Sequence, residues 1–473
     1  MIWSIAWKNI WRSKVRSLVV IFAVTIGIFG AVMLIGIMQG WINQRVSDAL
    51  NNEVSHIQIH HPEFLLNEEM KYVIPDYQTL VDSLENTTGI VAFSPRVKIF
   101  ALAQTDWASS GLILKGVDPE SEKLVSKIHE NLIEGGYFDD DAVLPSIVIG
   151  SMAAENLKLL NYEITPDKLQ KPQIIELGEE TLKNLQSLEG TRYRSEKDFR
   201  VALNSILTPD DYKEFGDMLV PCFSFYRLRA KITVTAQNMN GELVYLTYRV
   251  KGVYKTNNTA FDGITAFVRS DKLKAETGMA GNDYHEIALL TENKDLGVSI
   301  AGNLAEKFPK HDIMSWKELS PDLALYSDYM KFFDLIYVGI FLLALSFGII
   351  NTMLMAVLER VKELGMLMAI GMNKLKVFLM IMLESVFLTI TGAIAGMLFS
   401  GIVLSSLAKT GINLSMWAEG LEAIGYSSVI YPSISFGNYL GVILLVIITG
   451  ILSSLWPARK ALKLNPAEAL RTE

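Results

Sequence analysis

The placement of the apolar runs constrains this chain more than any other feature. Four runs fall at residues 18–40, 332–358, 377–407 and 439–456. Each approaches or exceeds the ~20 residues that a helix needs to cross a ~30 Å hydrocarbon core. Residues 41–331, between the first two runs, are charged and of ordinary composition. We therefore expect an α-helical membrane protein with four transmembrane helices and a large domain inserted between helices one and two.

The charge balance excludes one class of partner. Half of the 473 residues are hydrophobic and 20% are charged, as in a chain that combines a membrane bundle with a globular domain. Residues 41–331 contain 30 basic and 43 acidic residues, which gives this domain a formal charge of −13. An acidic surface repels phosphate backbones, so we expect no nucleic-acid partner. Cys222 is the single cysteine, which rules out an intrachain disulfide.

Lysine and arginine predict the orientation in the membrane. They cluster before the first run, between the second and third runs, and after the fourth: Lys8, Arg12, Lys14, Arg16, Arg360, Lys362, Lys374, Lys376, Arg459, Lys460, Lys463 and Arg471. The positive-inside rule then puts both termini and residues 359–376 in the cytoplasm. The domain 41–331 and the loop 408–438 are then expected on the outer side of the membrane. The first run is longer than the core of a signal peptide and no small-residue cleavage site follows it, so we expect a retained anchor.

The two ends of the chain carry different patterns. Residues 1–17 are predicted to form an interfacial amphipathic helix, because Trp3, Trp7 and Trp11 recur every four residues while Lys8 lies on the other side. A plain extension of the first span would show a similar pattern. Residues 457–473 are predicted to be a cytoplasmic tail.

The outer domain alternates strand and helix patterns, which predicts a mixed α+β domain in two lobes. Expected strands are residues 54–60, 91–104, 111–117, 147–150, 229–236, 243–254, 265–268, 286–291 and 312–316. Expected helices are residues 76–84 and 295–307, the second within a βαβ unit. A polar, helix-prone stretch at 161–221 is predicted to be an insertion, with helices at 175–185, 196–207 and 209–218.

No familiar catalytic motif is present in the sequence. It contains no GxxxxGK[ST] phosphate loop, no GxSxG elbow and no HExxH zinc pair. His60 and His61 are adjacent on an expected strand, so their side chains point to opposite faces and do not suit a metal site. We expect no enzyme activity, cofactor or metal in this chain.

Residues 359–376 are too polar for lipid and too apolar for a free loop. Val361, Leu364, Leu367 and Met368 fall near one helical face, and Arg360 can meet Glu363 at i, i+3. Gly365 and Gly371 permit tight turns. Such a segment can dock in a groove of a cytoplasmic protein, although a plain helical hairpin with solvated charges is the alternative. The candidate coupling residues are Glu359, Arg360, Lys362, Glu363, Leu364, Gly365, Ala369 and Gly371.

Three polar residues interrupt the expected spans. Asn351 and Glu384 lie deep, where an interhelical hydrogen bond is the simplest role. Asp334 lies at the outer boundary of the second span and is expected to be hydrated. The glycine pairs at 392 and 396 and at 437 and 441 suit close helix packing.

The order of one span, a large outer domain and three spans resembles the permease superfamily of type VII ABC transporters, which includes MacB-like, FtsX and lipoprotein-releasing (Lol) subunits. Three stretches carry the resemblance: AWKNIWRSKVR at residues 6–16, ERVKELG at 359–365 followed by Ala369 and Gly371, and WPARKALKLNPAEALR at 456–471. The second is similar to the coupling segment of that superfamily.

Within the superfamily, the outer domain is most similar to the Lol branch. The similar stretches are GIMQGW at 36–41, SPRV at 94–97, LKGVDPE at 114–120 and IGSMA at 149–153. The insertion 161–221 is longer than the branch leads us to expect. It lies near where some Lol permeases extend a hook toward a periplasmic carrier.

The resemblance implies a permease subunit that pairs with a second permease chain, identical or paralogous. It also implies a separate ATPase subunit that binds ATP and magnesium and moves the coupling segment. The expected cargo is the acyl anchor of a lipoprotein, extracted from membrane lipids and passed to a periplasmic carrier. The anchor would enter between helices one and two, along walls formed by Val24, Ile28, Val32, Phe341, Leu345 and Ile349. Two alternatives are MacB-like efflux or mechanotransmission and FtsX-type regulation of periplasmic hydrolases.

Overall fold

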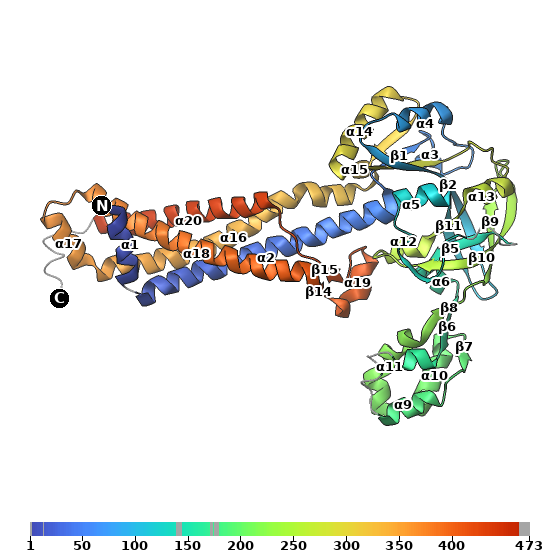
Figure 1. The fold of residues 1–473 in the computed structure, drawn as a ribbon, viewed down its shortest axis with the longest axis horizontal. Coiled ribbons are helices and arrows are strands. Elements are labelled where there is room, and N and C mark those ends of the chain that lie inside the picture. The colour runs from blue at the N-terminus through green and yellow to red at the C-terminus, as the bar shows by residue number, and fades with distance from the viewer. Residues whose placement is uncertain (1, 13, 139–143, 171–173, 175–178, 463–473) are drawn as a thin grey trace. The chain divides into compact units, whose positions relative to one another are not determined.

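The computed structural model describes residues 2–12, 14–138, 144–170, 174 and 179–462 (Figure 1). By packing, the chain divides into two compact units. The membrane unit comprises residues up to 44, 325–417 and from 427 onward, and the outer unit comprises residues 45–324 and 418–426.

Four helices within the described residues are long and apolar enough to cross a membrane, as predicted. They are α2 (Lys14–Ala49), α16 (Pro321–Glu359), α18 (Lys374–Thr410) and α20 (Phe436–Leu462). Short elements accompany them: α1 (Ile2–Arg12), α17 (Val361–Ala369), β14 (Ile412–Asn413), the 3₁₀ turn η2 (Ser415–Trp417) and β15 (Val429–Ile430).

Two of these helices extend beyond the predicted spans. α2 continues past residue 40 to Ala49, and α16 begins at Pro321 instead of residue 332. The added segments are polar, but no proline interrupts either of them after the first helical turn, so the backbone hydrogen bonds continue without the apolar pattern. The domain predicted at 41–331 therefore starts and ends within helices.

Small residues let α18 approach α2 closely. A Cβ at Gly392 would lie 2.7 Å from Val24 Cβ, and one at Gly396 would lie 2.9 Å from the carbonyl oxygen of Thr25. Only glycine fits at these two positions, so this predicted pair packs as expected. At the second predicted pair, by contrast, a Cβ at Gly441 would meet nothing within 4 Å.

The outer unit is built on one ten-stranded mixed sheet within the described residues. Its strands are β1 (Ile57–His60), β2 (Ile90–Gln104), β3 (Ser109–Val117), β4 (Leu132–Gly135), β5 (Ser146–Gly150), β9 (Lys231–Gln237), β10 (Leu243–Tyr254), β11 (Thr265–Arg269), β12 (Glu286–Thr291) and β13 (Asp312–Ser315). Nine of them correspond to predicted strands. The additional strand, β4, has four residues at one end of the sheet, too few to show an alternating pattern.

Six of these strands close into a barrel. β2 pairs with β3, β3 with β11, β11 with β5, β5 with β10, β10 with β9, and β9 returns to β2. Alternate side chains, such as Ile99, Leu114, Val234 and Tyr248, fill the interior as one apolar core.

Three of the remaining strands, β1, β12 and β13, form the second predicted lobe, which has its own apolar core, whereas β4 pairs with the barrel strand β10. β1 lies between β12 and β13 and is antiparallel to both, so β12 and β13 are parallel. The helix α14 (Lys294–Lys307) connects them, which gives the predicted βαβ unit with one strand inserted. Further helices of the outer unit are the π-helix η1 (Leu50–Val54), α3 (Phe64–Asn67), α4 (Tyr77–Glu85), α5 (Pro119–Val125), α6 (Ser151–Asn156), α12 (Thr259–Ile264), α13 (Ser270–Thr277), α15 (Trp316–Leu319) and α19 (Ala418–Ala423).

The predicted insertion is a small subdomain with a separate core. Its three-stranded sheet has the order β7 (Arg192–Tyr193), β6 (Leu160–Glu163), β8 (Ser224–Tyr226). Its helices are α7 (Pro166–Leu169), α9 (Glu179–Gln186), α10 (Glu196–Ile206) and α11 (Pro209–Phe223). The start of the helix predicted at 175–185 lies outside the described residues.

Candidate coupling site

The predicted coupling segment forms a short helix between two turns. Arg360, with φ −105° and ψ 15°, separates α16 from α17, and Gly371 has φ +98°, which favours glycine. Asn373 then caps α18 by accepting a hydrogen bond from the Leu375 backbone at 3.0 Å. Gly365 lies buried inside α17 and not in a turn, contrary to our expectation.

The apolar face predicted from the sequence points into the bundle. Leu364 is buried, and Leu367 and Met368 pack against the apolar core of the membrane unit. The opposite face of α17 is exposed and carries Lys362, Met366, Ala369 and Ile370 at helical spacing. Ile370, the residue that caps the C-terminal end of α17, is 86% exposed, which is unusual for an isoleucine.

A network of charged side chains holds α17 in place. Arg360 Nε donates to Glu363 Oε2 at 3.0 Å, and Arg360 Nη1 donates to Glu384 of α18 at 3.1 Å. Two residues of α1 complete it: Asn9 Nδ2 donates to Glu384 Oε1 at 2.6 Å, and Arg12 Nη2 donates to Glu363 Oε1 at 2.6 Å. The network therefore joins α1, α17 and α18.

The electrostatics keep the Glu363 carboxylate ionised. Burial by itself would raise the pKa of Glu363, but the hydrogen bond from Arg360 and the charges of Arg360 and Arg12 lower it below its ordinary value. Burial likewise opposes the charge of Arg360, yet the carboxylates of Glu384 and Glu363 raise its pKa. The ion pair between Arg360 and Glu363 thus persists at physiological pH.

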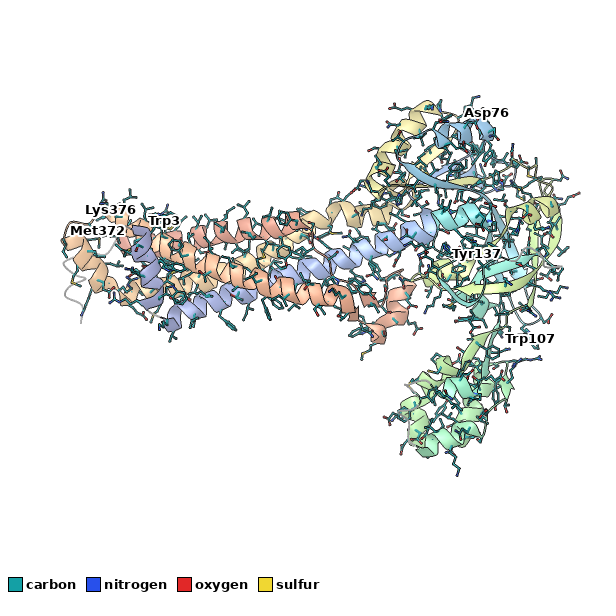
Figure 2. The ribbon with its side chains drawn as sticks, in the orientation of Figure 1. Trp3, Asp76, Trp107, Tyr137, Met372 and Lys376 are labelled. Carbon is teal, nitrogen blue, oxygen red and sulfur yellow. The ribbon has the colours of Figure 1, made fainter. Side chains whose placement is uncertain are left out.

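The helix α1 has two apolar faces with different environments. Ala6 and Ile10 are buried, whereas Trp3, Trp7 and Trp11 are exposed. Trp3 and Trp7 both contact the ring of Phe387 in α18. Figure 2 shows Trp3 at the same end of the membrane unit as Met372 and Lys376. Such an arrangement suits the predicted position at a membrane surface.

Five of the six residues predicted to form the acyl-chain walls are packed into the core of the membrane unit. Val24, Ile28, Val32, Leu345 and Ile349 are buried in the packed core of the membrane unit. Phe341 is half-buried, and a Cβ at Gly30 would lie 3.1 Å from its ring. A lateral cavity between helices one and two remains a prediction.

The three polar residues of the spans have different environments. Glu384 makes the interhelical hydrogen bonds expected of it. Asn351 is exposed and makes no side-chain hydrogen bond to any other residue that the structure describes. Asp334 is buried and not hydrated as we expected: it accepts hydrogen bonds from Gln39 at 2.6 Å and from Asn438 at 3.4 Å.

Several other predicted features can be placed. His60 is buried and His61 is half-buried, so the pair does not converge, and no cluster of metal ligands occurs in the described part of the chain. Cys222, the single cysteine, is half-buried. The stretch WPARKAL ends α20, whereas residues 463–471 of the tail motif lie outside the described residues.

Sequence reasoning missed Asn9, Arg12 and Ile370. The two polar residues lie about one turn apart in α1, which the sequence assigned to a membrane surface and not to α17. Ile370 follows Lys362 and Met366 at intervals of four, and this spacing was the available signal.

Comparison with known proteins places part of the chain in a family. Residues 335–466 match the FtsX-like permease C-terminal family. A "Macrolide export ATP-binding/permease protein MacB" of Chlorobium luteolum is 38% identical over 27% of this chain and 16% of its own length. The ABC transporter permease YknZ of Bacillus subtilis is 27% identical over 49% of this chain and 57% of its own length. The chain therefore covers less than two thirds of either relative.

The extracellular domain of a YknZ transporter from Gram-positive bacteria is similar in structure. The match covers 55% of this chain and 99% of that domain, with 14% identity and a TM-score of 0.28. This score is too low to establish a common fold.

Proposed function

We propose that this chain, whose residues 335–466 form an FtsX-like permease domain, is the membrane subunit of an ABC transporter. ATP and magnesium are bound by a separate ATPase subunit, which docks on the exposed face of α17. The observation that carries the proposal is Ile370, an exposed isoleucine on a short helix that a charge network fixes to α1 and α18. The termini and α17 are cytoplasmic, and the outer unit is periplasmic.

The docking face can be tested by substitution at an exposed position. We expect Ile370→Glu to reduce co-purification of the ATPase subunit at least tenfold, because a charge replaces the most exposed apolar side chain of the face. Leu66→Glu is the matched control, since Leu66 is 82% exposed in the outer unit. Equal co-purification of the two variants would remove the docking role from α17.

The charge network predicts a different defect. Glu363→Lys places a cation against Arg12 and Arg360, so we expect it to uncouple transport from ATP hydrolysis while the complex still assembles. Gly365→Trp should also uncouple, but it is less informative because Gly365 is buried and the larger side chain disturbs α17 directly. Normal transport by Glu363→Lys would contradict the coupling role of the network.

The second permease chain is supported by Asn351. An amide exposed to lipid is costly, and α16 is the least buried of the four spans. A partner helix would satisfy this amide and cover neighbouring exposed residues such as Leu343 and Phe347. We therefore expect disulfide cross-linking of Phe347→Cys between chains in membranes of a Cys222→Ser variant, and none for Ile448→Cys on α20.

The first candidate for the transport mode is MacB-like efflux or mechanotransmission. Its support is the tightly packed core of the membrane unit, which favours transmitted movement over passage of cargo through one bundle. Among the relatives, the name of the Chlorobium protein refers to macrolide export.

The second candidate is extraction of a lipoprotein from the inner membrane for a periplasmic carrier. It is supported by the exposed apolar faces of α2 and α16, which include Phe22, Ile26 and Ile340. Each buried CH₂ contributes ~0.8 kcal/mol, so lifting acyl chains from a membrane requires an apolar receptor and an energy source.

The two modes can be separated in liposomes. The complex is reconstituted with a triacylated lipoprotein and a soluble carrier, and transfer to the carrier is measured. Transfer that requires both ATP and the carrier would establish lipoprotein release. ATP hydrolysis without any transfer would favour efflux or mechanotransmission.

A further inference from the structure

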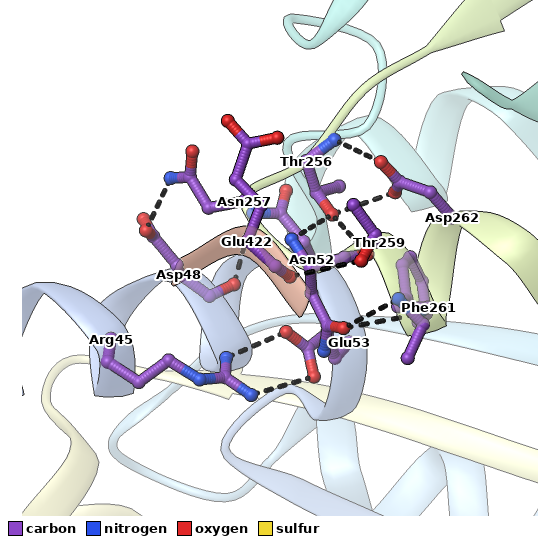
Figure 3. A network of polar contacts seen from close by, with 12 residues as sticks. Arg45, Asp48, Asn52, Glu53, Thr256, Asn257, Thr259, Phe261, Asp262 and Glu422 are labelled. Carbon is purple, nitrogen blue, oxygen red and sulfur yellow. Dashed lines mark hydrogen bonds and ion pairs between the residues drawn. The ribbon is translucent and has the colours of Figure 1, made fainter. Parts of the chain in front are cut away.

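The segment between α18 and α20 contributes a short helix to the outer unit. Residues 418–426, which include α19, pack with the outer unit although the chain on either side belongs to the membrane unit. By sequence, α19 is therefore the one covalent link from the α18–α20 hairpin into the outer unit. Figure 3 shows Glu422 of α19 beside residues of the outer unit.

Glu422 connects α19 to two places on the barrel. Its carboxylate forms an ion pair with Lys255 Nζ at 3.0 Å, and its backbone carbonyl accepts a hydrogen bond from Thr259 Oγ1 at 3.2 Å. Lys255 directly follows the barrel strand β10, and Thr259 begins α12, which leads into the barrel strand β11. One residue of α19 thus contacts the end of one barrel strand and the approach to another.

The turn that follows α19 contacts the end of α2. Gly425 has φ +81°, and a Cβ there would lie 2.7 Å from the guanidinium carbon of Arg45. Arg45 is in turn fixed by a two-point ion pair with Glu53 of the π-helix η1, the shorter contact being 2.8 Å. π-Helices are rare and frequently mark functional sites.

The loop that receives α19 is held rigidly. Asp262 accepts hydrogen bonds from the Thr256 backbone at 2.9 Å and the Thr256 hydroxyl at 2.8 Å. Asn258 caps α12 through two backbone amides. Asn257 donates to Asp48 at 2.8 Å, so the same loop is also fixed to α2. Glu422 therefore contacts a loop that hydrogen bonds fix at the ends of β10 and α12.

We propose that α19 is a transmission strut: Glu422 carries displacement of the α18–α20 hairpin to the barrel through Lys255 and Thr259. This inference rests on the proposed function, because the displacement originates in ATP binding by the partner subunit. Glu422, Lys255 and Gly425 are positioning residues and contact neither ATP nor cargo.

The test measures amide hydrogen exchange at residues 255–264 in the full complex, in nanodiscs, with and without a non-hydrolysable ATP analogue. We expect the analogue to change exchange at least fivefold in the unaltered chain. Glu422→Lys should abolish this change, and the swap Lys255→Glu/Glu422→Lys should restore at least half of it. Glu419→Lys, an exposed acidic residue of the same helix, is the matched control and should behave as the unaltered chain.

The outcomes separate the strut from the transport proposal. A nucleotide response that survives Glu422→Lys, or that is missing from the unaltered chain while ATP drives cargo movement, overturns the strut. A response that Glu422→Lys abolishes and the swap restores supports the strut even where no offered cargo moves. In that case only the proposed cargo fails.

Discussion

An arginine bridging two glutamates occurs in each unit of this protein, with opposite degrees of burial. In the outer unit, Arg96 pairs with Glu122 and with Glu286, each at 2.7 Å. In the membrane unit, Arg360 pairs with Glu363 at 3.0 Å and with Glu384 at 3.1 Å. Both trios consist of the same ion pairs between arginine and glutamate. We therefore relate their difference in burial to a difference in structural role.

The side chains of the outer trio are at most 4% exposed. Burial by itself would lower the pKa of Arg96, but the two carboxylates raise it, and the pKa of Glu286 falls well below its ordinary value. Removing one member leaves an uncompensated buried charge, so the trio has a single stable arrangement. It therefore fixes where β2, α5 and β12 meet.

The side chains of the inner trio are 17%, 34% and 9% exposed. Water can replace part of the contact between Arg360 and the more exposed Glu363, which makes this ion pair exchangeable at small cost, whereas Glu384 is buried. Their members lie on α17 and α18, and Arg12 of α1 joins the network. Partial exposure is suited to side chains that change ion-pair partners during a transport cycle. Full burial is suited to a permanent structural contact.

Breaking the buried trio should give the largest effect. Arg96→Met leaves two carboxylates in the core, and we expect a loss of about 3–5 kcal/mol in the free energy of unfolding of the outer unit. Chemical denaturation of the full chain, followed by a probe in the outer unit, measures it. The triple variant Arg96→Met/Glu122→Gln/Glu286→Met also removes the two carboxylate charges that Arg96→Met leaves unpaired. It should therefore recover most of the lost free energy of unfolding. A loss below ~1 kcal/mol for Arg96→Met would contradict the role of the trio.

The order of elements could be predicted because it depends on local patterns. Apolar runs gave the four spans, and alternation gave β10 and β12 with their observed bounds. Barrel closure could not be predicted, since β9 returns to β2 through pairs such as Leu102 with Thr235, more than 100 residues apart. Register between distant strands depends on the packed core and not on either strand alone.

At the candidate site, too, contacts between residues close in sequence could be predicted and contacts between distant helices could not. The pair Arg360 and Glu363 follows from i, i+3 spacing, but their bonds to Arg12 and Glu384 cross between helices far apart in sequence. The outward direction of Asn351 was also beyond the sequence, because the rotation of α16 depends on which of its apolar faces packs.

A pH titration should distinguish the outer trio from the inner trio through a smaller change in the free energy of unfolding. His285, next to Glu286, accepts a hydrogen bond from the Lys98 backbone and donates one to Met70. Burial lowers the pKa of His285 to about 4. Because the folded state disfavours the protonated ring, stability is intact above the unfolded pKa of ~6.5 and is lost as pH falls toward 4.

Between pH 6.5 and 5 this linkage should remove about 2 kcal/mol from the stability of the outer unit. Thermal unfolding of the full chain as a function of pH measures the loss, and His285→Gln, which does not titrate, should flatten the curve. Glu363 of the inner trio should not respond over this range, because its pKa is lowered and its carboxylate stays ionised. A pH dependence unchanged in His285→Gln would assign it to another group.

The smallest effect on stability should come from the most exposed contact. Arg12 bonds to Glu363 at 2.6 Å, but its side chain is 66% exposed, and exposed ion pairs contribute little to folding. We therefore expect Arg12→Ala to leave thermal unfolding of the membrane unit unchanged within error. Yet Arg12 is the contact through which α1 holds α17, so the same variant should lower ATP-driven transport severalfold. Lys8→Ala, on the same helix and without a bond to α17, is the control. Loss of stability without loss of transport would contradict this assignment. The inner network would then be a permanent structural contact like the outer trio.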